Sequence, residues 1–294
     1  MVKVDNTFAE AFPMKVSRLI VTAYNKNWAA KAAKSFCGFA TSVIACGCEA
    51  GIESEISPRE TPDGRPGVSI LVFSMSTKEL AKQILNRTGQ CLMTSPTSAV
   101  FSGNTGEVKI SLGNSLRYFG DGFQISKIIN DKRYWRIPVM DGEFLCEDFA
   151  YQMRGIGGGN FLILGENIQT VLNAAELAVK KMKKLKNIIL PFPGGIVRSG
   201  SKVGSKYKGL IASTNFEYCP NLKGVLKSKL DDQVKCVLEI VIDGISRDDI
   251  ELAMKVGILE ILNSKKINGI KRISAGNYGG NLGPYLFNLK SVIQ

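Results

Sequence analysis

The hydrophobic and polar residues of this chain follow two different periods, and the periods change in the same order in each half. In the first half the pattern predicts strands over residues 16–22, 41–46, 68–73 and 90–94 and helices over residues 28–36 and 77–87. Ser76 followed by Glu79 is typical of a capping box at the start of the second helix. The predicted order is therefore strand, helix, strand, strand, helix, strand.

The second half of the chain repeats this order. Its pattern predicts strands over residues 161–164, 188–190, 236–242 and 271–275, a helix over residues 169–186 and another helix that opens at residues 246–249. Two such units predict an α+β fold with two ferredoxin-like (βαββαβ) lobes in tandem. Each lobe is expected to be an antiparallel sheet with helices on one face.

Long insertions separate some of these strands. Residues 47–67 and 193–234 join the second and third strands of the two lobes, and loops of that length are usually functional. Residues 102–142 are predicted to form an additional hairpin-rich insertion before the second lobe. We therefore predict an N-terminal lobe over residues 1–144, which includes this insertion, and a C-terminal lobe over residues 145–294.

The chain has 294 residues, no histidine and a net charge of +12. The absence of histidine excludes Ser-His-Asp triads, Cys-His dyads and His-ligated metal centres, and we predict no metal site. Proton transfer must then use carboxylates, lysine, tyrosine, cysteine or groups of the substrate. The positive charge favours acidic ligands, although residues 180–186 (KKMKKLK) are typical of a solvated helix end.

The composition predicts a cytoplasmic protein. The N-terminal residues lack the basic start and apolar core of a signal peptide, and no apolar run approaches the roughly 18 residues needed to cross a bilayer. The seven cysteines show no pairing pattern, which fits reduced thiols. Nucleic-acid binding is an alternative for a basic protein, but aromatic residues do not alternate with the cations. We expect neither nucleic acid nor a membrane as a partner.

A glycine-rich segment at residues 191–206 (PFPGGIVRSGSKVGSK) is the strongest candidate for binding an anion. Glycines after a strand expose backbone N–H groups and allow close approach to the backbone. Arg198, Lys202 and Lys206 add positive charge beside those donors. A second glycine run, at residues 155–160, lacks the last glycine of a dinucleotide fingerprint and precedes a predicted strand, so we exclude that motif.

Glu239 is the best single candidate for a catalytic residue. It is the only charged residue in the apolar run CVLEIVI, at residues 236–242, which has the composition of a central strand. A buried ionised carboxylate is costly, so we expect its pKa to rise toward the range that suits an acid/base catalyst. The alternative is that Glu239 pairs with a lysine such as Lys235, and the spacing alone does not distinguish the two.

Segments over nearly the whole chain resemble one protein family. They are DNTFAEAF (5–12), GFATSVI (38–44), EAGIE (49–53), ETPDGRPGV (60–68), GQCLMTSPT (89–97), FGDGF (119–123), PFPGGIV (191–197), SKVGSK (201–206), ASTN (212–215), YCP (218–220) and ISAGNYGG (273–280). In these segments the chain resembles the formylmethanofuran:tetrahydromethanopterin formyltransferases of methanogenic and related archaea. The resemblance implies a chain of two ferredoxin-like lobes, and chains of that family assemble as dimers and tetramers.

The resemblance implies a reaction of one-carbon metabolism, including methanogenesis. A formyl group is transferred reversibly from N-formylmethanofuran to N5 of tetrahydromethanopterin, with no bound cofactor, because both coenzymes act as substrates. The family's proposed catalytic glutamate matches Glu239, which favours the acid/base role. In the glycine-rich segment, the expected substrate-binding residues are Gly194, Gly195, Ser201, Lys202, Ser205 and Lys206. Gly194 and Gly195 are expected to donate to an oxyanion.

The expected partners are anionic small-molecule coenzymes and further copies of the chain, as a homodimer or homotetramer. Two alternatives remain from the resemblance: a paralogue without catalysis, or a partner-dependent subunit of a formyltransferase/hydrolase complex. The chain also departs from the familiar members, which are acidic, and it has Arg198 where a small residue is common. These differences suggest another salt environment or an altered substrate tail.

Overall fold

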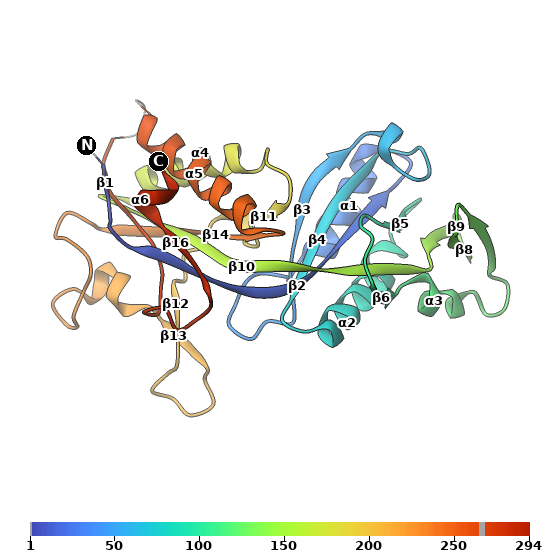
Figure 1. Ribbon diagram of the computed structural model, residues 1–294, viewed down its shortest axis with the longest axis horizontal. Coiled ribbons are helices and arrows are strands. Elements are labelled where there is room, and N and C mark those ends of the chain that lie inside the picture. The colour runs from blue at the N-terminus through green and yellow to red at the C-terminus, as the bar shows by residue number, and fades with distance from the viewer. Residues whose placement is uncertain (1, 265–267) are drawn as a thin grey trace. The chain divides into compact units, whose positions relative to one another are not determined.

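The computed structural model describes residues 2–264 and 268–294, which form two compact units. Unit 1 comprises the described residues of Met1–Pro13, Ser42–Cys46 and Ile156–Gln294, and unit 2 comprises Met14–Thr41 and Gly47–Gly155. Two long strands, β2 (Phe8–Thr22) and β10 (Phe149–Gly165), contribute residues to both units (Figure 1). The two-lobed, mixed helix-and-strand architecture follows the α+β expectation.

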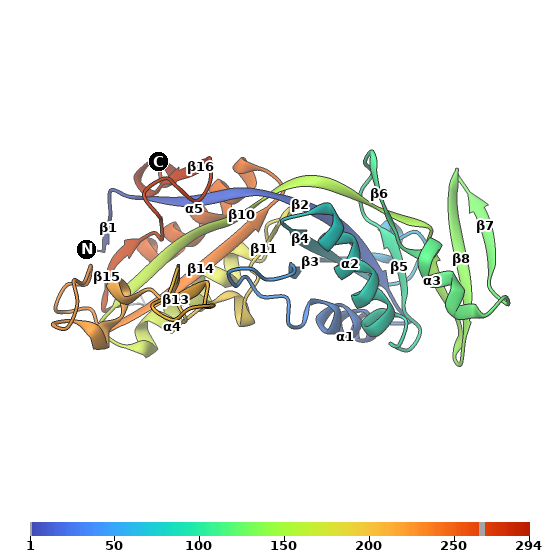
Figure 2. The same ribbon diagram turned by 90° about the horizontal axis from the view of Figure 1, so that it is seen from below.

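Unit 2 begins with β2 and has the order strand, helix, strand, strand, helix, strand. The elements after β2 are α1 (Lys26–Cys37), β3 (Glu49–Ile56), β4 (Gly67–Ser74), α2 (Thr77–Arg87) and β5 (Ala99–Ser102). All pairs are antiparallel, and the strands lie in the order β3-β4-β2-β5. The helices α1 and α2 lie on one face of this sheet (Figure 2), because alternate strand residues and one side of each helix are apolar.

The predicted hairpin-rich insertion of unit 2 is present. Along the chain it lies between β5 and β10. Its elements are β6 (Val108–Ser111), α3 (Gly113–Leu116), a 3-10 turn (Arg117–Gly120), β7 (Ile125–Ile129), β8 (Lys132–Val139) and β9 (Gly142–Glu147). Strands β7, β8 and β9 form an antiparallel meander, and β9 pairs in parallel with β5.

Unit 1 repeats the order of unit 2. Its elements besides β2 and β10 are β1 (Lys3–Val4), α4 (Ile168–Met182), β11 (Ile188–Ile189), 3-10 turns at Pro193–Gly195, Phe216–Tyr218 and Pro220–Leu222, β12 (Ser201–Val203), β13 (Ala212–Thr214), β14 (Cys236–Gly244), α5 (Arg247–Asn263), β15 (Ile270–Ser274), β16 (Tyr285–Asn288) and α6 (Leu289–Val292). The strands lie in the order β11-β14-β10-β15, again antiparallel. The long segment between β11 and β14 carries the separate β12–β13 hairpin.

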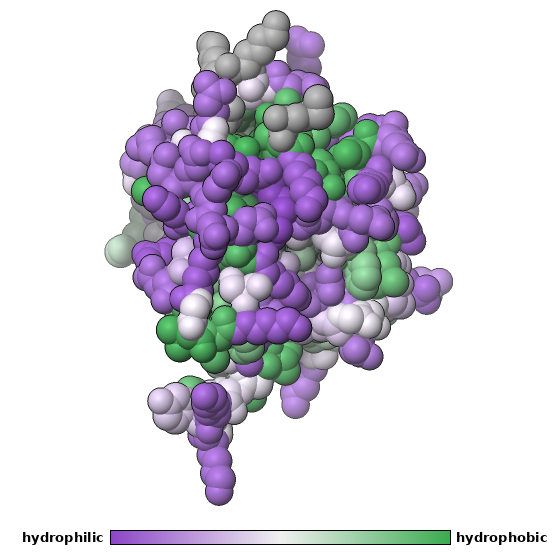
Figure 3. Space-filling view, turned by 90° about the vertical axis from the view of Figure 1, so that its left-hand side faces the viewer, coloured by the Kyte–Doolittle hydropathy of each residue, from purple (hydrophilic) through white to green (hydrophobic). Residues whose placement is uncertain are grey.

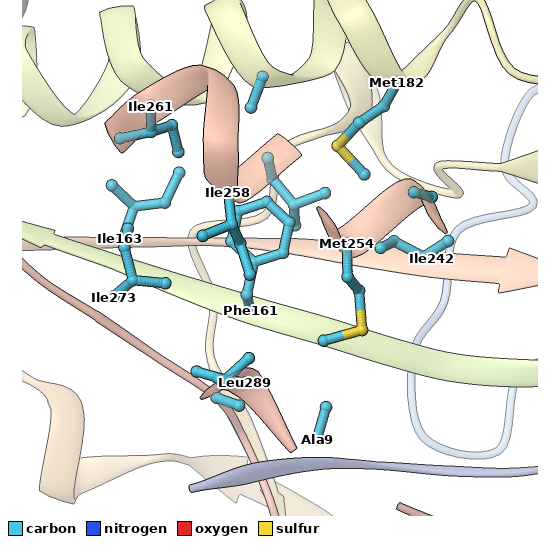
Figure 4. Close-up of a cluster of buried hydrophobic side chains, with 14 of the residues drawn as sticks. Ala9, Phe161, Ile163, Met182, Ile242, Met254, Ile258, Ile261, Ile273 and Leu289 are labelled. Carbon is cyan, nitrogen blue, oxygen red and sulfur yellow. The ribbon is translucent and has the colours of Figure 1, made fainter. Parts of the chain in front are cut away.

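The core of unit 1 lies between α4, α5 and one face of this sheet. Phe161 and Ile163 of β10 pack with Ile258 and Met254 of α5 in Figure 4. Helix α5 begins where the sequence predicts, because Ser246 accepts the N–H of Asp249 and the Asp249 carboxylate accepts the N–H of Ser246. The sheet face opposite the helices is therefore the face that remains for a site.

Two strand predictions are wrong. Residues 41–46 form no strand, because Phe39 and Ala45 have left-handed backbone angles (φ 62° and 65°) that break an extended chain. The second strand of unit 2 is β3, inside the segment predicted as a long insertion. Residues 90–94 are also not a strand, since the chain continues from α2 into a π turn at Thr88–Leu92 and the strand follows at β5.

Two helix details also differ from the prediction. Ser76 caps α2 by accepting the N–H of Glu79, but the Glu79 carboxylate instead accepts from Gln83, so only half of the capping box is present. Helix α4 ends at Met182, four residues early, within the lysine-rich run. The lysines of that run are exposed, as predicted for a solvated helix end.

One face of unit 1 is mainly polar. Figure 3 views the left-hand side of Figure 1 and shows hydrophilic side chains over much of this face, with smaller hydrophobic patches between them. Among the described residues, no helix combines the length and the apolar character needed to span a membrane.

Candidate functional site

The candidate site is centred on Glu239, near the middle of β14. The Glu239 backbone is held on both sides: it lies opposite Leu162 of β10, and it exchanges two hydrogen bonds with Val197, of 3.0 and 2.9 Å. Leu238 and Ile240 point into the core under the helices. Because side chains alternate along a strand, Glu239 lies on the opposite, helix-free face of the sheet.

The Glu239 carboxyl is more easily protonated in this protein than it would be in water. Its side chain is only partly exposed, and burial raises the pKa of Glu239 to about 7. Within residues 2–264 and 268–294, no ion pair joins Glu239 to Lys235 or to another cation. The alternative of a Glu239–Lys235 pair is therefore not supported, and the carboxyl is suited to exchange a proton near neutral pH.

The backbone at Gly276, just after β15, lies beside this carboxyl. A Cβ atom on Gly276 would lie 3.7 Å from Glu239 Oε1 and 3.4 Å from Asn160 Oδ1. Asn160, which is 7% exposed, comes from β10. It ends the glycine run at residues 155–160, which lies within β10, whereas the sequence pattern placed this run before a strand.

Tyr278 is a titratable neighbour of Glu239. Burial raises the pKa of the Tyr278 hydroxyl, and the charges of Glu239 and Glu10 raise it further. The Tyr278 hydroxyl donates to the Ser201 carbonyl at 3.2 Å. Glu10 itself is fully buried and accepts the N–H groups of Gly280 and Leu282. The turn after β15 is thus held within reach of the carboxyl.

The predicted glycines lie next to the strand segment that pairs with Glu239. Gly194 and Gly195 have left-handed φ angles of 69° and 90°, which favour glycine, and Val197 follows them. The Gly195 N–H donates to the Phe192 carbonyl at 2.8 Å. The Gly194 carbonyl accepts from Lys183 at 3.3 Å.

The other predicted binding residues lie on the β12–β13 hairpin. Ser201 is linked to the site through Tyr278, whereas the Lys202 ammonium lies 5.2 Å from the centre of the Phe216 ring. The Ser205 hydroxyl accepts the Tyr207 N–H, and Lys206 is exposed. The loop joining β12 and β13 extends away from α4 and α5 in Figure 1. The structure therefore brings Ser201 to the Glu239 site but shows no contact of the Lys206 side chain with it.

Three residues of the site were not singled out by the sequence: Asn160, Glu10 and Gly276. Their signals were present, since Asn160 ends the glycine run, Glu10 lies in the family-like DNTFAEAF segment and Gly276 precedes the turn at residues 277–280. The pairing of β10, β14 and β15 brings Asn160 and Gly276 together, and the hydrogen bonds from Gly280 and Leu282 bring in Glu10. Among the described residues, no group of three or more Cys, Asp or Glu is arranged to hold a metal ion.

The fold and the candidate site define a two-lobed, mixed α/β protein with a partly buried carboxyl of raised pKa on the helix-free face of one sheet. Two family models match the chain: "Formylmethanofuran-tetrahydromethanopterin formyltransferase" over residues 1–139 and "FTR, proximal lobe" over residues 142–292. The chain belongs to the formylmethanofuran-tetrahydromethanopterin formyltransferase family, whose members are acyl-group transferases.

Relatives and solved structures agree with this assignment. A formylmethanofuran–tetrahydromethanopterin formyltransferase from Methylococcus capsulatus is 60% identical, over 99% of this chain and 98% of its own. The structure of the enzyme from Methanosarcina barkeri is 45% identical, with a TM-score of 0.92, and covers 99% of this chain and 98% of its own. The formyltransferase/hydrolase complex from Methylorubrum extorquens, solved with methylofuran, has a chain that is 49% identical. Its TM-score is 0.95, over 100% of this chain and 97% of its own.

Proposed function

We propose that this chain catalyses the reversible transfer of a formyl group from N-formylmethanofuran to N5 of tetrahydromethanopterin. Family membership supports this reaction, and the observation that carries the mechanism is the Glu239 carboxyl, with a pKa of about 7. The Methylococcus relative, which is named as a formyltransferase, is more similar than the chain of the formyltransferase/hydrolase complex. The similarity therefore favours an enzyme over a partner-dependent subunit or an inactive paralogue.

In the proposed mechanism both coenzymes bind together, which makes the attack effectively intramolecular. The N5 lone pair adds to the formyl carbon, and the carbonyl electrons move to oxygen to give a tetrahedral oxyanion. Ionised Glu239 takes the N5 proton and then donates it to the methanofuran nitrogen as the C–N bond breaks. The carbonyl reforms, so one proton and one formyl group have moved and Glu239 is ionised again.

The glycine-rich segment supplies the proposed contacts to the substrates. The Gly195 N–H is already engaged by Phe192, so Gly194 is the better donor to the oxyanion of the pair. We propose that Ser201, Lys202, Ser205 and Lys206 bind the anionic parts of the coenzymes, because exposed cations attract carboxylates and phosphates. No further bound cofactor enters this mechanism, since the coenzymes themselves are the substrates.

We also propose the finer architecture and assembly. Each lobe is ferredoxin-like, a proposal supported by the identical element order and strand order of the two units, and the lobes divide at residues 144 and 145. The chain is proposed to form a homodimer or homotetramer in the cytoplasm, where its seven cysteines would stay reduced. Sedimentation velocity of the purified protein tests the assembly, and a monomer would contradict it.

The test of the reaction is an assay of the purified protein with formylmethanofuran and tetrahydromethanopterin, followed by the absorbance of the formyl-pterin. We expect the wild type to be active. Replacing the acid/base group in Glu239→Gln should lower kcat by about 10²–10⁴-fold and leave KM nearly unchanged. Glu55→Gln, at a carboxylate whose side chain is 77% exposed, is the matched control. An inactive, folded wild type would contradict the reaction, and a fully active Glu239→Gln variant would contradict the mechanism.

A further inference from the structure

The side chain of Asn160 forms hydrogen bonds with both backbone groups of Gly276, in the turn after β15. It pairs with this residue in the way that the backbone of a neighbouring strand would. The Gly276 N–H donates to Asn160 Oδ1 at 2.7 Å, and Asn160 Nδ2 donates to the Gly276 carbonyl at 3.1 Å. Asn160 Nδ2 also donates to the Gly158 carbonyl at 3.1 Å. A buried carboxamide thus satisfies both backbone groups of Gly276 beyond the last residue of β15, Ser274.

Gly276, which Asn160 holds in this way, lies beside the Glu239 carboxyl. Since a Cβ atom on Gly276 would lie 3.7 Å from Glu239 Oε1, only a hydrogen of glycine borders the carboxyl oxygen on that side. Because the Gly276 N–H is bonded to Asn160, it does not compete with a substrate N–H for the Glu239 carboxylate. Gly276 therefore leaves room for a reacting group and offers Glu239 no competing donor.

Other contacts hold the rest of the turn but not this point. Asn277 Nδ2 donates to the Phe8 carbonyl at 3.0 Å and to the Thr7 hydroxyl at 3.1 Å. The Glu10 carboxylate accepts from the backbone farther along, at Gly280 and Leu282. Of these anchors, only Asn160 bonds directly to the backbone that borders Glu239.

We propose that Asn160 is the positioning residue for proton transfer by Glu239, because it keeps the side-chain-free backbone of Gly276 beside the carboxyl. This inference rests on the proposed function. Without the Asn160 carboxamide, the Gly276 N–H is free to donate to the Glu239 carboxylate or to water, and the Gly276 carbonyl needs a new donor. The carboxyl then loses its orientation toward the substrate nitrogens and gains contact with water. Tyr278 lies close enough to Glu239 and to Glu10 for the charges of both carboxylates to raise the pKa of its hydroxyl.

Asn104 provides a matched control in unit 2. Its Oδ1 accepts the Arg18 N–H at 2.9 Å, and its Nδ2 donates to the carbonyls of Tyr151 and Thr105 at 3.0 and 3.2 Å. Asn104 therefore makes the same three kinds of backbone hydrogen bond as Asn160, in a unit that does not contain Glu239. Asn160→Ala and Asn104→Ala therefore remove equivalent side-chain to backbone hydrogen bonds. Only those of Asn160 lie beside the Glu239 carboxyl.

The kinetic test compares these two variants with the wild type. Since misplacement of a reacting group by about 1 Å costs about 10²-fold, we expect Asn160→Ala to lower kcat by about 10–100-fold with little change in KM. Asn104→Ala should keep the wild-type kcat, even if its melting temperature falls. Equal kcat values for wild type and Asn160→Ala, or equal losses in both variants, would overturn the inference. An inactive wild type would instead contradict the proposed function.

A second measurement needs no turnover. The Glu239 carboxyl is titrated by ¹³C NMR in protein labelled at glutamate, with the signal assigned by its loss in Glu239→Gln. In Asn160→Ala we expect the titration midpoint of Glu239 to move to lower pH, because water reaches the carboxyl. Asn104→Ala should leave it unchanged. An unchanged midpoint in folded Asn160→Ala would overturn the inference whether or not formyl transfer is observed.

Gly276→Ala tests the other half of the arrangement. The new methyl group would meet Asn160 and Glu239 only at ordinary contact distances of 3.4 Å or more, so the variant should fold. The methyl would occupy the space beside Oε1 and lower kcat/KM by about 10-fold or more. Gly89→Ala, whose added methyl also meets only an ordinary contact of 3.6 Å, should have wild-type activity. Full activity of Gly276→Ala would show that no reacting group uses this space.

Discussion

Replacement of Glu239 by glutamine changes how the stability of this protein depends on pH. Burial raises the pKa of Glu239 to about 7 in the folded protein. Between the ordinary pKa of a carboxyl and pH 7, the folded state therefore holds a proton that the unfolded chain has released. Stability contributed by this group is present at low pH and is lost as pH rises through about 7. Glutamine mimics the protonated carboxyl and removes this loss.

The size of the effect follows from the pKa difference. One proton changes the free energy of unfolding by about 1.4 kcal/mol per pH unit, so the full window between the two pKa values is worth about 3 kcal/mol. Because the Glu239 side chain keeps some contact with water, about 3 kcal/mol is the upper limit of its contribution to the free energy of unfolding. We expect Glu239→Gln and wild type to be similarly stable at pH 5, and the variant to be more stable by up to about 3 kcal/mol at pH 8.5.

Urea unfolding of both proteins between pH 5 and 8.5, followed by circular dichroism, measures this difference. Glu55→Gln is the control, because an exposed carboxylate should give a difference that does not change over this range. A stability difference between wild type and Glu239→Gln that is constant with pH would contradict this account. It would mean that the carboxyl is not desolvated in the folded protein.

Three further predictions concern binding, capping and thiol chemistry. Lys206→Ala should raise KM for the anionic coenzymes by about 2–5-fold at low salt and less at high salt; an increase that salt does not reduce would argue against charge pairing. Ser246→Ala should lower the free energy of unfolding by about 1 kcal/mol, measured by urea denaturation, because it removes the cap of α5; an unchanged midpoint would contradict the cap. Burial raises the pKa of the Cys37 thiol to about 12. Alkylation of Cys37 by iodoacetamide at pH 8, followed by mass spectrometry, should therefore be much slower than alkylation of the free amino acid cysteine. Rapid modification of Cys37 would contradict its burial.

The strongest periodic segments could be predicted from the sequence because their structure is local. Helix α5 follows from its cap and from the helical spacing of its apolar residues, and the core of β14 follows from a branched apolar run. The segments at residues 41–46 and 90–94 show where this fails. Short apolar runs fit a strand, a turn or a helix equally well, and left-handed residues such as Ala45 are not visible in the pattern.

The amino-acid sequence was enough to predict the mixed helix-and-strand character, the repeated element order and the family, and it singled out Glu239 as the candidate catalytic carboxyl. These depend on local periodicity, on matching segments and on one charged residue in an apolar strand. The meeting of Asn160, Gly276 and Tyr278 at that carboxyl became visible in three dimensions alone. The reason is that β10, β14 and β15 pair across long stretches of chain, and no local pattern encodes which side chains become neighbours across strands. The folded chain likewise showed that the Gly195 amide is already bonded, and that Asn160 holds the backbone beside Glu239.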